Sequence, residues 1–186
     1  MITYQFLDAI NFAFELHRNQ FRKGTNVPYI AHLLSVASMV IEEGGDEEVA
    51  IAALLHDAVE DQGGLKTLEE IKIRYGERVS EIVLGCTDTL ITPKPAWRDR
   101  KETYLRHLKT ASPDVVLVSL SDKIHNARSI LMDLQKYGSV TWKRFNGGKD
   151  GTLWYYKELV NIFLLRGSPV LANELSRLYE AIELFQ

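Results

Sequence analysis

Apolar residues recur at helical spacing along most of the chain. Between residues 3 and 20 they return every three or four positions, which predicts an amphipathic helix. The same spacing, interrupted by glycines and prolines, predicts further helices over about residues 29–43, 67–76, 78–87, 97–109, 115–136, 153–166 and 169–185. No alternation of apolar and polar residues between turn signals predicts a strand. We therefore expect an all-α protein, a single helical bundle of about eight or nine helices.

The most apolar stretch, residues 50–61, has the sequence AIAALLHDAVED and changes character halfway. Its first half is apolar throughout, as in a helix that is buried on every side. Asp46 supplies a helix cap before this stretch, and Gly63-Gly64 supplies a stop after it. The pattern predicts one continuous helix between these two signals.

The end of this predicted helix concentrates charge in a way that an apolar core does not favour. His56 and Glu60 are four residues apart and share one face of the helix, and Asp57 and Asp61 share the adjoining face. Burying carboxylates without partners is costly, and the C-terminal end of a helix dipole favours cations instead. A bound metal ion would remove this conflict.

Composition and charge narrow the class of protein. Hydrophobic residues make up 46% of the chain and charged residues 25%, as in ordinary globular proteins, and the net charge of −3 provides no overall attraction to nucleic acid or membrane. The single cysteine, Cys86, cannot form an internal disulfide. The N-terminus lacks the basic and then apolar segment that is typical of a signal peptide. No apolar run approaches the length of about 18 residues that is typical of a transmembrane helix. We expect a cytoplasmic protein that binds neither nucleic acid nor membrane.

Two further residues are of metal-ligand type, His32 and Asp122. Taken alone, His32 is a hydrogen-bonded structural histidine and Asp122 an acid on a solvated helix face. Together with His56 and Asp57 they supply two imidazoles and two carboxylates, a mixed set that suits Mn²⁺, Fe²⁺ or Zn²⁺. Such an ion lowers the pKa of a bound water and provides hydroxide near neutral pH.

Three segments of the chain resemble the motifs of a known family. They are Arg22-Lys23 followed by Pro28–His32, Ala52–Asp61, and Ser121–Arg128. Their order resembles that of HD-domain metal-dependent phosphohydrolases, and most of all the hydrolase domain of RelA/SpoT-type alarmone enzymes and small alarmone hydrolases. The resemblance covers about residues 5–135 and implies a single HD-type phosphohydrolase domain over residues 1–186.

The resemblance also implies roles for individual residues. It implies that one metal ion, Mn²⁺ or another divalent ion, is bound by His32, His56, Asp57 and Asp122. It implies that the attacking water is positioned and activated by Glu60 and Asp61. It implies substrate contacts at Arg22 and Asn126 and an aromatic near the base at Tyr155, to which we add Lys23 and Lys149 as candidates.

Other aromatic and basic residues have two interpretations. Tyr155 is in a Trp-Tyr-Tyr run that suits a packed core as well as a nucleotide base, and Lys149 follows a glycine pair in what is either a surface loop or a loop over phosphates. We interpret the basic cluster of Arg98, Arg100 and Lys101 as a solvated helix face in preference to a phosphate site.

The activity implied by the resemblance is hydrolysis of the 3′-diphosphate of guanosine tetra- or pentaphosphate to pyrophosphate and GDP or GTP. Leu33, Gln62 and Ser121 depart from the family pattern, and the last third of the chain matches weakly. Two alternatives therefore stay open: a related phosphohydrolase acting on adenosine alarmones, the 2′-phosphate of NADPH or nucleoside phosphates, and a non-catalytic nucleotide-binding regulator. The expected partner is a small nucleotide, and the aromatic last two helices would permit a homodimer.

Overall fold

The structure, a computed structural model, describes residues 1–185 and is helical throughout. In chain order its helices are α1 (Tyr4–His17), α2 (Ile30–Glu42), α3 (Glu47–Leu55), α4 (Ala58–Asp61), α5 (Leu65–Tyr75), α6 (Glu77–Cys86), α7 (Trp97–Leu108), α8 (Pro113–Tyr137), the 3₁₀ helix η1 (Gly138–Arg144), α9 (Gly148–Arg166) and α10 (Pro169–Glu183). Within the described residues no helix combines the length and the apolar character needed to cross a membrane. The predicted all-α fold is confirmed.

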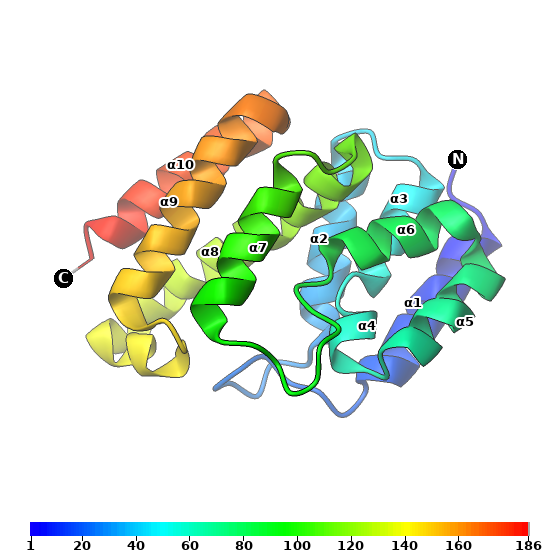
Figure 1. Cartoon of the computed structure of the whole chain (residues 1–186), viewed down its shortest axis with the longest axis horizontal. Helices are drawn as coiled ribbons and strands as arrows, with labels where there is room; N and C mark the ends of the chain where they lie inside the picture. The colour runs from blue at the N-terminus through cyan, green and yellow to red at the C-terminus, as the bar shows by residue number, and fades with distance from the viewer. Residues whose placement is uncertain (186) are drawn as a thin grey trace.

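Helix α8 is the longest helix and holds the two ends of the molecule together. It packs against α2, α3 and α6 and also against η1, α9 and α10. Figure 1 shows α9 and α10 at one end of the molecule and α1 and α5 at the other. The start of α8 follows the sequence signal, because the Ser112 hydroxyl accepts a hydrogen bond from the Val115 amide at 3.3 Å and Pro113 occupies the first turn.

Helix α3 forms the centre of the core. Asp46 caps it by accepting a hydrogen bond from the Val49 amide at 3.1 Å, as its sequence predicts. Every residue from 49 to 55 is at most 2% exposed, because α1, α2, α6 and α8 all pack against this helix. The side chains that follow α3 are therefore delivered to the interior of the bundle.

The predicted continuous helix through residues 56–61 is wrong. Helix α3 ends at Leu55, His56 and Asp57 form a turn, and α4 begins at Ala58. Both residues keep backbone angles in the right-handed helical region, φ −58° and ψ −30° for His56 and φ −98° and ψ −4° for Asp57, so the break is a local one. His56 Nε2 and Asp57 Oδ2 lie 3.0 Å from each other. This break, with the additional helix η1, gives ten α-helices and one 3₁₀ helix in the described residues.

Candidate metal centre and active-site cavity

The four predicted metal ligands meet at one point in the bundle. Helix α2 supplies His32, the turn between α3 and α4 supplies His56 and Asp57, and α8 supplies Asp122. His32 Nε2 lies 3.2 Å from Asp122 Oδ1 and 3.6 Å from Asp57 Oδ2. His56 Nε2 lies 3.7 Å from Asp122 Oδ1. Three of the residues, His32, His56 and Asp57, offer ligand atoms that all lie within 4.8 Å of one another.

The two histidines are arranged as metal ligands are. His32 is 1% exposed and His56 2% exposed, and within the described residues neither Nε2 atom has a hydrogen-bond partner. Both Nδ1 atoms are occupied, that of His56 by the Ala53 carbonyl at 2.8 Å and that of His32 by His125 Nδ1 at 2.8 Å. A buried polar atom without a partner is costly. A cation bound between the carboxylates and the two Nε2 atoms would remove that cost, so these residues fit a metal ion.

The electrostatics of the centre favour positive charge. Burial opposes protonation of His56, but Asp57 and Asp122 outweigh it and raise the pKa of this imidazole to about 10. Burial likewise opposes ionisation of Asp57 and Asp122, yet their histidine neighbours, and for Asp122 also the Lys123 ammonium, hold the pKa of both carboxyls well below the usual range. The two aspartates are therefore ionised and available to a cation.

Further side chains orient the two ligand carboxylates. The Tyr29 hydroxyl donates to Asp57 Oδ2 at 2.6 Å, and the Asn126 amide donates to Asp122 Oδ1 at 2.5 Å. Asn126 in turn accepts a hydrogen bond from the Arg22 guanidinium. Such outer partners hold metal ligands in place.

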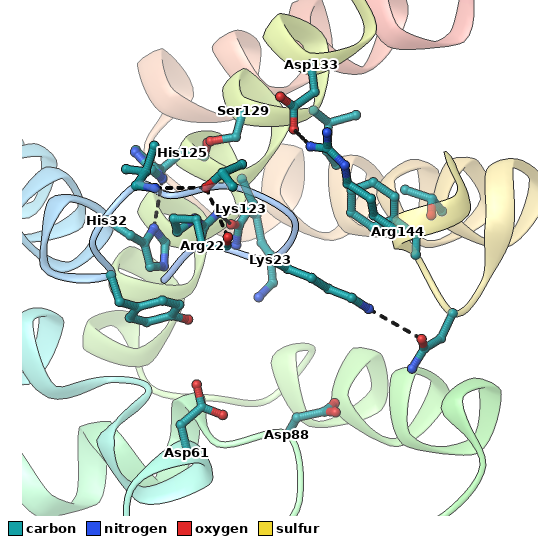
Figure 2. A pocket seen from close by; sticks show the side chains of 18 of the residues that line it. Arg22, Lys23, His32, Asp61, Asp88, Lys123, His125, Ser129, Asp133 and Arg144 are labelled. Atoms are coloured by element: carbon teal, nitrogen blue, oxygen red, sulfur yellow. Dashed lines mark hydrogen bonds and ion pairs between the residues drawn. The ribbon is translucent and has the colours of Figure 1, made fainter. Parts of the chain in front are cut away.

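The centre borders a cavity of about 830 Å³, large enough for a nucleotide. Figure 2 shows Asp61 and Asp88 on one side of this cavity and Arg22, Lys23 and Lys123 on the other. Acids and cations thus both line the cavity, and Lys123 lies directly beside the predicted ligand Asp122.

The two predicted catalytic acids are held differently. Asp61 Oδ2 accepts a hydrogen bond from the Gln20 amide at 2.8 Å. Burial and the nearby charge of Asp57 raise the pKa of the Asp61 carboxyl. Glu60 is fixed at both oxygens, by the Lys94 ammonium at 2.8 Å and by the Asp88 backbone amide at 3.2 Å. The Asp61 carboxylate is therefore a stronger base than an ordinary aspartate, and Glu60 is held at both of its oxygens.

A second recess of about 200 Å³ adjoins the metal centre and is bordered by two lysines, Lys101 and Lys123. Burial lowers the pKa of Lys101 to about 8. Tyr155 also borders the recess: the residue is 6% exposed, and within the described part of the chain its hydroxyl has no hydrogen-bond partner. An ammonium next to an unpartnered hydroxyl suits a phosphoryl oxygen.

The predicted substrate contacts fall into two groups. Arg22, Lys23, Asn126 and Tyr155 all line the cavity. Lys149 does not line it, because its ammonium donates to the Phe185 carbonyl at 3.2 Å beyond α10. The structure thus brings four of the five together.

The interpretation of the α7 cluster as a solvated face is wrong for two of its three members. Arg98 does lie outside, stacked 3.2 Å from the centre of a Trp154 ring. Arg100 and Lys101 point inward, where Arg100 pairs with Asp88 and Lys101 lies 3.4 Å from the same carboxylate. Helical spacing predicts that these residues share a region of α7. It does not predict which other part of the chain covers that region.

Several other residues of the site carried no sequence signal that we used. Gln20, Tyr29, Asp88, Lys94 and Lys123 lie in loops or next to a motif residue, and each contacts a predicted ligand or acid. For Tyr29 and Lys123 a signal existed, since both lie inside segments that carry the resemblance, Pro28–His32 and Ser121–Arg128.

His125 also borders the cavity. Burial lowers the pKa of its imidazole to about 4, and the Arg22 guanidinium adds to the effect. The ring of His125 is therefore neutral at pH 7.

These features define a class of protein: an all-helical bundle in which histidines and aspartates from three segments face a cavity lined by cations. The model of the HD domain matches residues 9–148. The chain belongs to the HD-domain family.

Several proteins that are similar to this chain are named for an enzymatic activity. The chain is 42% identical over 127 residues to guanosine-3′,5′-bis(diphosphate) 3′-pyrophosphohydrolase MESH1 of Xenopus tropicalis, covering 67% of this chain and 68% of that protein. The MESH1 of Homo sapiens is 37% identical over 129 residues, covering 68% and 69%. The solved structure of a metazoan ortholog of SpoT that hydrolyses ppGpp matches with a TM-score of 0.80 and 26% identity over 97% of this chain and 96% of that one.

Proposed function

We propose that this chain is a metal-dependent hydrolase of guanosine 3′,5′-bis(diphosphate), which releases the 3′-diphosphate as pyrophosphate. The nucleotide product is GDP, or GTP when the substrate is the pentaphosphate. The observation that carries the proposal is the pair of buried Nε2 atoms of His32 and His56, which have no hydrogen-bond partner among the described residues and face two ionised aspartates beside a cation-lined cavity. The activity named for the MESH1 relatives supports the same substrate.

The metal ion would be Mn²⁺, held by His32, His56, Asp57 and Asp122. When bound, such an ion polarises a phosphoryl oxygen and lowers the pKa of a coordinated water. Tyr29 keeps Asp57 in place through its 2.6 Å hydrogen bond, so that the ligand set is ordered before substrate arrives.

The reaction needs a group that accepts a proton from the attacking water, and Asp61 fits this role. Its raised pKa makes it a stronger base than an ordinary aspartate, and the Gln20 amide fixes its direction. The water oxygen forms a bond to the phosphorus next to the ribose, the bond from that phosphorus to O3′ breaks, and O3′ takes up a proton. Glu60, fixed by Lys94 and by the Asp88 amide, positions the water.

The cations of the cavity hold the phosphates. Arg22 presents a planar fork of donors that matches the oxygens of a diphosphate. Lys101 and Lys123 offset charge that develops on the phosphoryl group in the recess. The hydroxyl of Tyr155, which has no partner in the described part of the chain, donates a hydrogen bond to the same group. Lys23 and Asn126 line the remaining wall.

We further propose that residues 1–186 form a single HD-type domain, of which Gln186 lies outside the described residues. A cytoplasmic location and a homodimer formed through α9 and α10 stay predictions. Size-exclusion chromatography with light scattering will give the mass in solution, and a mass of one chain would contradict the dimer.

The test is hydrolysis by the purified chain with Mn²⁺, followed by chromatography of the nucleotides and an assay of pyrophosphate. We expect equal amounts of pyrophosphate and GDP from guanosine tetraphosphate, and no reaction with GTP, which lacks a 3′-diphosphate. If the chain releases orthophosphate from NADPH and no pyrophosphate from guanosine tetraphosphate, the proposed substrate is wrong and NADPH takes its place. Binding of guanosine tetraphosphate without turnover would make the chain a regulator.

A further inference from the structure

The two ligand histidines hold their second ring nitrogen in different ways. His56 Nδ1 faces a backbone carbonyl, that of Ala53, which can only accept a hydrogen bond. His32 Nδ1 faces another imidazole, that of His125, at 2.8 Å. The rings of His32 and His125 lie 4.7 Å apart at an angle of 45°, and both are held by helices, α2 and α8. The contact joins the helix that carries His32 to the helix that carries Asp122.

A short contact between two imidazole nitrogens requires one donor and one acceptor. To bind a metal through Nε2, His32 must keep that lone pair free and carry its proton on Nδ1. His125 must then accept at Nδ1 and carry its own proton on Nε2. A carbonyl oxygen can only accept a hydrogen bond, so it always holds the proton of its histidine partner on Nδ1. His125 does this for His32 only in one of its two neutral forms, the one with its own proton on Nε2.

We propose that His125 is the positioning residue that fixes the tautomer and ring direction of His32, and that it thereby sets the affinity of the centre for its metal. This inference rests on the metal centre of the proposed function but not on its substrate. It gives a role to a side chain whose ring contacts no ligand carboxylate in the described residues.

Three substitutions separate this role from simple packing. In His125→Asn the side-chain oxygen is bonded to Cγ, as Nδ1 is in histidine, so an acceptor remains in nearly the same place. In His125→Gln the acceptor lies one bond further out, and in His125→Leu there is none. Mn²⁺ affinity of each metal-free protein is measured by isothermal titration calorimetry and by loss of the electron paramagnetic resonance signal of free Mn²⁺.

We expect His125→Leu and His125→Gln to bind Mn²⁺ about 10- to 100-fold more weakly than the unaltered protein, and His125→Asn to recover most of the affinity. His107→Leu is the matched control, since His107 is an exposed histidine whose Nε2 faces the Gly85 carbonyl. Circular dichroism checks that each variant is folded. His125→Asn reports on the acceptor even if the leucine variant does not fold.

Two results would overturn the inference: unchanged affinity in His125→Leu, or affinity in His125→Asn as weak as in His125→Leu. Either result, with Mn²⁺ still bound by the unaltered protein, would leave the proposed function standing. Absence of Mn²⁺ binding to the unaltered protein would overturn both.

Discussion

Replacing Lys101 by methionine should make the protein more stable and less active. The Lys101 side chain is only 19% exposed, and burial lowers its pKa from 10.5 to about 8. At 1.36 kcal/mol for each tenfold change in proton affinity, keeping this lysine protonated in the folded state at pH 7 costs about 3 kcal/mol. Methionine has a similar unbranched shape and no charge. Loss of the cation–π contact with the Tyr155 ring, at 5.1 Å, offsets about 0.5–1 kcal/mol of the gain.

The gain should depend on pH in a known direction. Between pH 8 and 10.5 the unfolded chain binds more protons at Lys101 than the folded one, so the stability of the unaltered protein rises with pH over this range. The methionine variant lacks this titration. Its advantage should therefore be about 2–3 kcal/mol at pH 7 and should disappear as the pH approaches 10.5.

The assay is urea unfolding of both proteins in a chelating buffer at several pH values, followed by circular dichroism. Lys157→Met is the matched control, because Lys157 is exposed on α9. The free energy of unfolding of this control variant should match that of the unaltered protein. For the same Lys101→Met variant, kcat/KM for guanosine tetraphosphate should fall about 10- to 100-fold, as expected for loss of a charged hydrogen bond worth about 1.5–3 kcal/mol. A Lys101→Met protein that is no more stable at pH 7, or whose gain does not shrink with pH, would refute the reasoning.

Three further predictions concern the metal centre and the acids. Asp57→Ala should lose both Mn²⁺ binding and turnover, whereas Glu60→Gln should keep Mn²⁺ affinity and lose most of the turnover; calorimetry and the pyrophosphate assay check this, and full activity of Glu60→Gln would remove its role. Tyr29→Phe removes the donor to Asp57 and should weaken Mn²⁺ binding about 10-fold or more, so an unchanged dissociation constant would contradict it. Gln20→Leu removes a donor that lowers the pKa of Asp61, so the acid limb of the kcat profile should move to higher pH, and an unmoved limb would count against Asp61 as the base.

The sequence predicted most of the helices, because helical periodicity and caps are local properties. It also pointed to the four candidate metal ligands through their residue types and their motifs. Asp46 and Ser112 cap helices where their sequence context predicts it. The turn at His56-Asp57 was not predicted, since nothing in the residues themselves stops the helix there. Both side chains meet His32 and Asp122 at the centre, and such tertiary contacts leave no trace in local periodicity.

The sequence also did not predict that the Lys101 side chain points inward. This direction depends on the loop between α6 and α7. Asp88 in that loop is buried, pairs with Arg100 and lies 3.4 Å from Lys101, so α7 presents its basic residues to the cavity instead of to solvent. The backbone amide of the same Asp88 holds Glu60. Asp88 thus contacts both cations through its carboxylate and the candidate acid through its backbone amide. Because neighbouring cations repel one another, we expect this carboxylate to offset part of the repulsion between Arg100 and Lys101.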